Sequence, residues 1–174
     1  MKKLIISGLV LVVLTFFMSC TSDDDANSNE LMVGTWKLTE INMSEAYDVN
    51  GDGIANEDLL LEVDCQNNEI IEFSSNNTAV ISTTSFTDIY ASALEGTENN
   101  FVFEVDCFQE VDSFTIAYQV VGNTVVLGDD EFDTVGVLNN DTYSFLVEDA
   151  IEFDFDDNST MTATGNVVYV FTRQ

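Results

Sequence analysis

The stretch 113–127 reads SFTIAYQVVGNTVVL, and its pattern decides the class of fold. Between Phe114 and Val120, large apolar residues alternate with Thr, Ala and Gln, which is typical of a strand with one buried face. Gly122 and Asn123 then supply the two residues of a tight turn before a second apolar run. The stretch therefore predicts an antiparallel hairpin.

Short apolar runs joined by Asn-rich turns recur on both sides of this hairpin. Turns are predicted at Asn76-Asn77 and at Asn139-Asn140-Asp141, because Asn tolerates the positive φ of tight hairpins. The other runs that read as strands are 35–41, 70–73, 79–84, 101–105, 132–138, 142–147, 151–155 and 167–171. The one helix predicted is 57–63, where Leu59, Leu60 and Val63 share a face.

Eight to ten sequential antiparallel strands, with one short helix after the first, favour an all-β fold. We expect an up-and-down β-barrel over residues 31–174, because closure removes the exposed edges of a sheet. A related β-sandwich is the alternative.

The N-terminus has the three parts of an export signal. Lys2 and Lys3 precede an apolar stretch at 4–18, and Ser19-Cys20 follows. The stretch 17–20 resembles a lipobox, in which the cysteine thiol is acylated. We therefore expect residues 1–19 to be a lipoprotein signal peptide and Cys20 to carry the lipid that holds the protein at a membrane. An ordinary signal peptide or a membrane anchor is the alternative.

Residues 20–30 are polar and include Asp23-Asp24-Asp25. Such sequence cannot bury enough apolar area to fold, so we expect a flexible tether. An acidic run soon after an acylated cysteine resembles the surface-export signal of lipoproteins in Bacteroidota. That resemblance implies an outer-membrane lipoprotein displayed on the cell surface. A plain spacer, with the protein on the periplasmic face, is the alternative.

The composition is strongly acidic, with 32 Asp and Glu against 4 Lys and Arg, and a formal net charge of −28. Only Lys37 and Arg173 are basic after Cys20. Nucleic-acid binding depends mainly on neutralising phosphates with Lys and Arg. The composition therefore excludes nucleic acid as a partner.

The side-chain inventory also argues against an enzyme. The chain has no histidine, which rules out Ser-His-Asp and Cys-His arrangements and histidine-bearing zinc sites. Schiff-base chemistry would rest on Lys37 alone, and no phosphate-binding glycine loop is present. Glu152, Asp154 and Asp156 share one face of a predicted strand, but alternation makes that the solvent face. We expect no catalytic residues.

Cys65 and Cys107 remain once Cys20 is lipidated. An even pair in an oxidising compartment predicts a disulfide that closes a loop of about 40 residues. Two buried free thiols are the alternative.

The stretch 48–58 reads DVNGDGIANED and predicts a calcium loop. Oxygen-bearing side chains alternate along it before Gly53, and hard Ca²⁺ binds six to eight such oxygens. It resembles the calcium loop of dockerin modules, although Leu59 stands at the twelfth position, where that loop has an acid. A metal-free turn is the alternative. The candidate ligands are Asp48, Asn50, Asp52, the carbonyl of Ile54, Asn56 and Asp58.

Gly34-Thr35-Trp36 opens the first predicted strand, and Arg173 ends the last. This combination resembles the G-x-W signature and the terminal arginine of lipocalins, as in the lipocalin-like lipoproteins of Bacteroidota. The resemblance covers residues 31–174. It implies that Gly34, Trp36 and Arg173 close one end of the barrel, with the guanidinium across the indole face.

An eight-stranded barrel of this family has an interior wide enough for its own side chains or for one small ligand. The expected function is therefore binding of a small apolar molecule. The alternative is a non-catalytic surface module with a filled interior, which docks a protein or a glycan.

Overall fold

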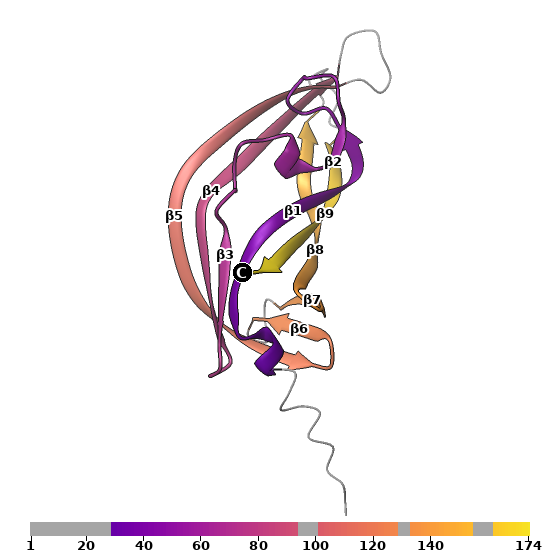
Figure 1. Ribbon diagram of the computed structural model, residues 1–174. Helices are drawn as coiled ribbons and strands as arrows, with labels where there is room; N and C mark the ends of the chain where they lie inside the picture. Colours follow the sequence, from indigo (N-terminus) through magenta and orange to yellow (C-terminus); the bar gives the residue numbers. More distant parts are fainter. Residues whose placement is uncertain (1–28, 94–100, 129–132, 155–161) are drawn as a thin grey trace, which may run out of the picture.

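A computed structural model describes residues 29–93, 101–128, 133–154 and 162–174 of the protein (Figure 1). Within these ranges the chain forms nine strands, one 3₁₀ turn (η1, Leu59–Leu61) and a helical turn at 29–32. The strands are β1 (Gly34–Tyr47), β2 (Asn56–Asp58), β3 (Ile70–Ser74), β4 (Thr78–Ala93), β5 (Phe101–Val121), β6 (Thr124–Leu127), β7 (Thr134–Asn139), β8 (Thr142–Asp154) and β9 (Thr162–Arg173).

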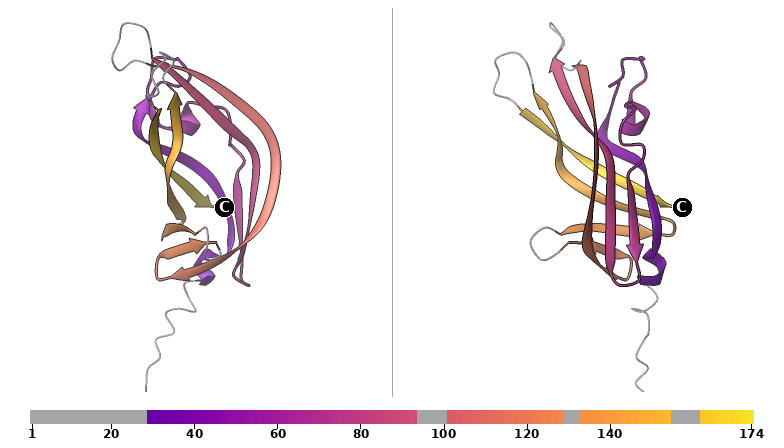
Figure 2. Two further views of the ribbon diagram at one scale, coloured as in Figure 1. Left: turned by 180° about the vertical axis from the view of Figure 1, so that it is seen from behind. Right: turned by 90° about the vertical axis from the view of Figure 1, so that its left-hand side faces the viewer.

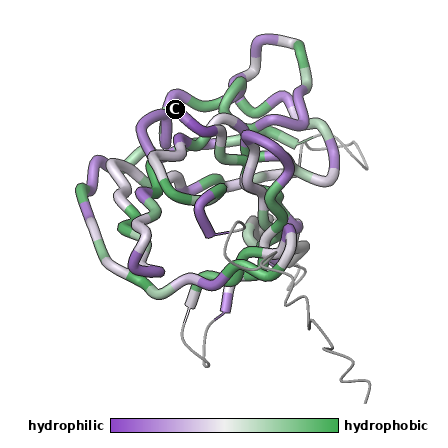
Figure 3. The backbone as a smooth tube through the Cα atoms, turned by 60° about the horizontal axis from the view of Figure 1, so that its bottom comes forward, coloured by the Kyte–Doolittle hydropathy of each residue, from purple (hydrophilic) through white to green (hydrophobic). Residues whose placement is uncertain are grey.

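Eight of these strands close into a barrel. They follow the order β1-β3-β4-β5-β6-β7-β8-β9, and β9 pairs back onto β1 from Trp36↔Arg173 to Met43↔Val167. All of these pairings are antiparallel, and β2 adds to β1 beyond the end of β3. The predicted all-β up-and-down barrel is confirmed, in place of the sandwich alternative. Figure 3 shows the strands running around this ring, with hydrophobic and hydrophilic residues interspersed along them.

The hairpin turns lie where Asn and Gly were expected to place them. Asn77 (φ 63°), Gly122 (φ 63°) and Asn140 (φ 54°) have positive φ between β3 and β4, β5 and β6, and β7 and β8. Asn and Gly reach this left-handed region at the lowest cost, so these residues set the strand register at three of the connections.

The largest buried side chains gather at the end of the barrel where β1 begins and β9 ends, which we call the closed end. Phe73 lies at its centre, with its ring centroid 4.9 Å from that of Tyr118, 5.9 Å from Tyr143 and 6.3 Å from Trp36, all edge to face. Met32, from the helical turn, is fully buried against this cluster. Aromatic burial of this kind dominates the energetics of small cores.

Strands β4 and β5 are longer than predicted. The sequence indicated separate strands at 101–105 and within 113–121, whereas β5 is continuous from Phe101 to Val121. The register with β4 shifts between Thr83 and Ser85, where β5 carries an extra residue. Because of this bulge, the odd-numbered residues of β5 point inward before it, and the even-numbered residues point inward after it. Two alternating patterns out of phase therefore belong to one strand.

The short strands β6 and β7 lie between β5 and β8. They pair with the part of β5 and of β8 that is near the closed end. β6 pairs with Tyr118–Val121 of β5, and β7 pairs with Thr142–Phe145 of β8. Among the described residues, the rest of β5 and of β8 has no strand partner on that side. Figures 1 and 2 show the long β4 and β5 bowing away from β8 and β9.

The predicted helix at 57–63 is wrong in its extent. Its first residues form β2, with Asp58 opposite Asn42, and only Leu59–Leu61 turn as a 3₁₀ helix. Asp58 explains the change, because its Oδ1 accepts from the N–H of Leu60 and of Ile41 in β1. Tertiary pairing with β1 therefore overrides the weak helical pattern.

Candidate functional site

The closed end of the barrel is built around Trp36, which has no exposed surface. Its Nε1 donates to the carbonyl oxygen of Met32 at 2.8 Å. The guanidinium carbon of Arg173 lies 4.5 Å from the centroid of the indole ring, and Arg173 Nη1 donates to the carbonyl oxygen of Val33 at 2.8 Å. Stacking and hydrogen bonding together hold this cation across the ring.

Gly34 lies directly against this pair. Its φ is +137°, and a Cβ built there would lie 3.2 Å from Arg173 Nη1. Arg173 also has its Nε 3.6 Å from Oδ1 of the exposed Asp141. The structure thus brings Gly34, Trp36 and Arg173 together at one end of the barrel, among its largest buried side chains.

Tyr143 lies in the same end with no exposed surface, and within the described residues its hydroxyl has no hydrogen-bond partner. Burial raises the pKa of Tyr143 above its usual value. An unsatisfied buried hydroxyl costs free energy, whereas the hydroxyl of Tyr118 donates to the carbonyl oxygen of Ser74 at 2.9 Å.

We therefore expect Tyr143→Phe to leave the free energy of unfolding unchanged or to raise it by about 1 kcal/mol, whereas Tyr118→Phe lowers it by about 1 kcal/mol.

Unfolded tyrosine loses its proton near pH 10, while folded Tyr143 keeps it to higher pH. Stability should therefore fall as the pH rises above that value, and less steeply in Tyr143→Phe. Urea unfolding on either side of pH 10 measures both effects. A clear loss of stability in Tyr143→Phe at neutral pH would contradict the expectation.

A cavity of about 320 Å³ lies beyond the aromatic core, towards the opposite end of the barrel. Its wall comes from β1, η1, β4, β8, β9 and the segment after η1. Four of its lining residues are aliphatic and buried or half-buried, namely Ile41, Leu59, Ile89 and Val167. The other lining residues are Gln66, Thr87, Asp88, Tyr90, Ala150 and Tyr169.

Five of the ten lining residues have polar side chains, and two of them, Tyr169 and Gln66, have described contacts. The ring of Tyr169 stacks on Phe145, with centroids 5.4 Å apart, and burial raises the pKa of Tyr169. Gln66 Oε1 accepts from Thr87 Oγ1 at 3.5 Å. A neutral phenol and an amide can orient a ligand by hydrogen bonds while the aliphatic side chains supply apolar contact.

Cys65 and Cys107 form a disulfide, with Cα atoms 5.9 Å apart. The predicted pairing is confirmed. It joins the segment after η1 to β5, and the residue after Cys65 is Gln66, whose N–H donates to Ser85 Oγ at 2.8 Å. The disulfide therefore fixes one wall of the cavity.

Comparison of the chain with protein-family models, with curated proteins and with solved structures found no match. The function must therefore be inferred from the barrel, its cavity and its loops.

The loop 48–58 is held by its own side chains. Asp48 Oδ2 accepts from the N–H of Gly53 at 2.9 Å. Asn50 Oδ1 accepts from the N–H of Asp52 at 2.9 Å, and Asp52 Oδ1 accepts from the N–H of Ile54 at 2.8 Å. The other oxygen of Asp48, Oδ1, is buried and has no hydrogen-bond partner within the described residues. Three of the predicted ligands are thus adjacent, and one of them has an unused acceptor.

The acid that closes this loop is Glu62, which the sequence did not single out. Glu62 is 4% exposed, and its Oε2 accepts from the N–H of Val49 at 2.9 Å and of Asn50 at 3.2 Å. Its Oε1 accepts from Asn56 Nδ2. The only signal in the sequence is an acid between the apolar residues Leu61 and Val63.

The remaining predicted ligands face other partners. Asp58 bonds to β1 and to η1, as described above, and Asn56 Nδ2 lies 3.4 Å from the carbonyl oxygen of Ile54. Across residues 29–93, 101–128, 133–154 and 162–174, no three Cys, Asp or Glu side chains converge as a metal-binding group.

A second buried glutamate stabilises the irregular part of β4. Glu69 is 6% exposed, and its carboxylate accepts from the N–H of Thr84 at 3.0 Å and of Ser85 at 3.2 Å. The carboxylate therefore satisfies main-chain donors beside the register shift, close to the cavity wall.

The predicted leader, Cys20 and most of the tether lie outside the described residues, as do Phe132, Phe155 and Asp156. The last two tether residues, Asn29 and Glu30, belong to the helical turn. Within the part of the chain that the structure describes, no helix has the length and hydropathy to cross a membrane.

Proposed function

We propose that this protein is a lipid-anchored, lipocalin-like binding protein whose barrel takes up one small apolar molecule. The observation that carries the proposal is the cavity of about 320 Å³ between the packed aromatic core and the opposite end of the barrel. Ligand sites are typically concave and mostly apolar, with a few polar groups that fix orientation. The volume suits a single small molecule.

The arrangement of Trp36 and Arg173 supports the lipocalin-like assignment. Both residues lie at the closed end, on the paired first and last strands of the barrel. The proposed role is binding without catalysis, because the chain has no histidine and its one lysine after Cys20 lies between buried neighbours on β1. Strand alternation places that lysine on the face away from the core.

The anchor is proposed from residues 1–20 together with the acidic run after them. A lipid on Cys20 would hold the barrel at the outer membrane, and the acidic run supports display on the cell surface. The tether would keep the barrel clear of the lipid headgroups, which are themselves anionic and repel an acidic chain.

Native mass spectrometry of the protein, extracted mildly from membranes, tests binding and anchoring together. We expect a mass that begins at an acylated Cys20, plus one retained small molecule that leaves on denaturation. An unprocessed or unacylated chain would contradict the anchor. An acylated chain that carries no small molecule would favour the second candidate function instead.

That second candidate is docking of a protein or a glycan on the outer surface of β4 and β5. Phe86 and Phe108 stack there with ring centroids 4.8 Å apart, and both are about two-fifths exposed. Val111 nearby is 85% exposed. Exposed apolar side chains that cluster in this way mark interaction surfaces more often than scattered ones do.

We also propose that the loop 48–58 binds one structural Ca²⁺. The unpartnered Oδ1 of Asp48 supports the fit, because a buried carboxylate oxygen without a donor is costly unless a cation binds it. Asp48, Asn50, Asp52 and the carbonyl of Ile54 would supply oxygens, and water would complete the set because Asp58 is engaged with β1.

Adding millimolar Ca²⁺ to protein treated with EGTA should raise the melting temperature by several degrees. When the Ca²⁺ concentration is ten to a hundred times the Kd of a site of extracellular affinity, binding adds about 1.4 to 2.7 kcal/mol to the free energy of unfolding. Asp52→Ala should abolish the shift, and Glu57→Gln, an exposed acid in the same loop that is not a predicted ligand, should keep it. The same melting temperature with Ca²⁺ and with EGTA in the unmodified protein would rule the site out.

A further inference from the structure

Much of β5 has a strand partner on one side only. β4 pairs along it from Phe101 to Ala117, whereas β6 covers the other side only at Tyr118–Val121. No other strand of the described chain pairs with β5. We call the side of residues 106–115 that faces away from β4 the open edge. Such an edge offers a row of main-chain donors and acceptors to another extended segment.

The main-chain groups of the open edge follow from the antiparallel ladder. The carbonyl oxygen of Ala117 accepts from the N–H of Gly128 on the side of β6. Groups of alternate residues point to the same side of a strand, so those of Ser113 and Thr115 also point away from β4. The N–H of Ser113 is met by Oδ1 of its neighbour Asp112 at 2.7 Å, and not by a strand.

The side chains of this stretch are both apolar and acidic. Every residue from 106 to 115 is exposed, including the apolar Val111 and Phe114 and the acids Asp106, Glu110 and Asp112. Asp106 lies directly opposite Asp88 of β4, on the outer face of the sheet. Like charges at opposed positions repel each other, and a base on an added strand would relieve this repulsion.

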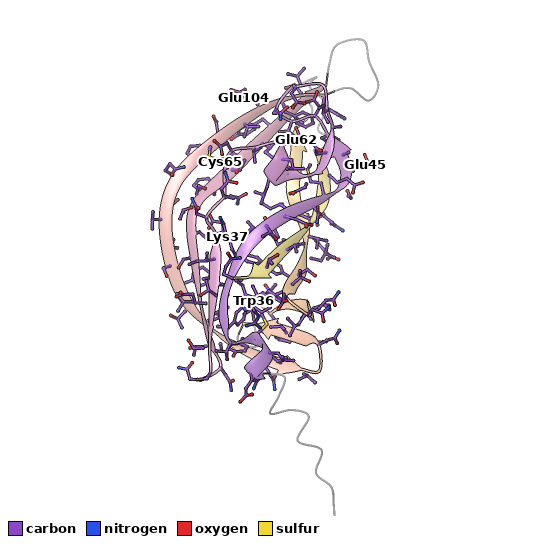
Figure 4. All side chains as sticks on the ribbon, viewed as in Figure 1. Trp36, Lys37, Glu45, Glu62, Cys65 and Glu104 are labelled. Atoms are coloured by element: carbon purple, nitrogen blue, oxygen red, sulfur yellow. A yellow bond between two sulfur atoms is a disulfide. The ribbon has the colours of Figure 1, made fainter. Side chains whose placement is uncertain are left out.

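The described chain supplies no such base. Lys37 and Arg173 are its only basic residues, and their strands, β1 and β9, do not pair with β5. Figure 4 shows Lys37 near Trp36, whereas Glu104 of β5 lies towards the opposite end of the barrel. A second copy of the chain would bring its own acids to the open edge, which disfavours pairing of like with like. The charges therefore favour a basic partner.

We propose that the open edge of β5 binds an extended segment of another protein, rich in Lys or Arg among apolar residues, as an added β-strand. Main-chain hydrogen bonds would hold the segment, and its side chains would give specificity. Its bases would lie near Asp106, Glu110 and Asp112, and its apolar side chains near Val111 and Phe114. The site does not involve the cavity, so its failure would leave the proposed small-molecule binding in place.

Three dye-labelled peptides of about ten residues, the length of a long strand, test the inference by fluorescence anisotropy with the full-length protein. The first alternates Lys with Val, the second is the same peptide with every amide N-methylated, and the third alternates Glu with Val. At low salt the first should bind at least about tenfold more tightly than the other two, because it alone combines positive charge with main-chain donors. Equal binding of the N-methylated peptide, or no binding of the first, would overturn the inference.

Thr115→Pro removes a donor from the open edge without removing a bond to β4. It should weaken binding of the Lys-Val peptide by about tenfold, whereas Thr115→Ala, which keeps the N–H, should not. Equal binding by the two variants, both melting as folded proteins, would contradict the open edge as the site. A dimer of the unmodified protein that Thr115→Pro dissociates would identify a second copy as the occupant, against the proposal.

Charge variants decide the matter if Thr115→Pro does not fold. Asp106→Asn combined with Glu110→Gln should weaken binding of the Lys-Val peptide at low salt by about fivefold. Glu40→Gln combined with Glu72→Gln removes two exposed acids from β1 and β3 and should change it little. Equal effects of the two double variants would show attraction by net charge alone and contradict the proposal.

Discussion

Replacing Trp36 with alanine should lower the free energy of unfolding by about 3 to 5 kcal/mol, the range expected when a large buried aromatic side chain is truncated. Trp36 has no exposed surface and meets Phe73 edge to face. Its removal also leaves the guanidinium of Arg173 above a void and deprives the carbonyl of Met32 of its donor. Both losses add to the free-energy cost of the void that the missing indole ring leaves.

Urea unfolding followed by far-ultraviolet circular dichroism measures this change, since Trp36 is the chain's one tryptophan and its own fluorescence disappears with it. Trp36→Phe is the matched control. It keeps an aromatic ring but loses the Nε1 hydrogen bond, so it should cost clearly less than the alanine variant. A loss of under about 1 kcal/mol in Trp36→Ala would contradict a closed end that is built on this ring.

Opening the disulfide is the second change with a large expected effect. The double variant Cys65→Ser, Cys107→Ser should lose about 3 to 4 kcal/mol, because the bond closes a loop across a sequence separation of 42 and restricts the unfolded chain. The loss should also weaken ligand binding, since Gln66 follows Cys65 on the cavity wall. Along its bowed part β5 pairs with no described strand other than β4, and this bond ties it to the segment after η1.

Melting curves with and without a thiol reductant test this directly. The reductant should lower the melting temperature of the unmodified protein and leave that of the double serine variant unchanged. Two reactive thiols after unfolding would show that the reductant has opened the bond. If the melting temperature of the unmodified protein is nevertheless the same in both conditions, the bond contributes nothing to stability.

The hairpins could be predicted because local chemistry sets them. Asn77, Gly122 and Asn140 take the left-handed conformations that their residue types favour. The alternation from Phe114 to Val120 predicts a strand with one buried face. Tyr118 and Val120 are buried and Ile116 is half-buried, but Phe114 is exposed. Closure of the barrel follows from such strands in sequence.

The long β4 and β5 could not be predicted in the same way. The bulge near Ser85 reverses the phase of alternation along β5, so a period-2 pattern reads the strand as two. Residues from Phe108 to Thr115 are exposed on both faces, and no buried face marks their alternation. Register shifts of this kind depend on the partner strand and not on the local sequence.

The buried glutamates show a further limit of sequence reasoning. Glu62 and Glu69 bind main-chain N–H groups of segments that are distant in the sequence, such as Val49 and Thr84. Acidic residues are usually exposed, and apart from the apolar neighbours of Glu62 the local sequence does not indicate this structural role. The position of the cavity is equally a result of tertiary structure, because its wall combines five elements and one loop segment.

A fluorescence titration with the neutral dye N-phenyl-1-naphthylamine gives the sharpest test of the cavity as a ligand site. Ile89→Trp fills the cavity from its wall, whereas Val102→Trp adds the same side chain on the exposed face of β5. We expect saturable binding of one dye per chain in the unmodified protein and in Val102→Trp. Binding should be lost in Ile89→Trp, which should still melt as a folded protein. Equal binding in both variants, or no saturable binding by the unmodified protein, would contradict a barrel that encloses its ligand.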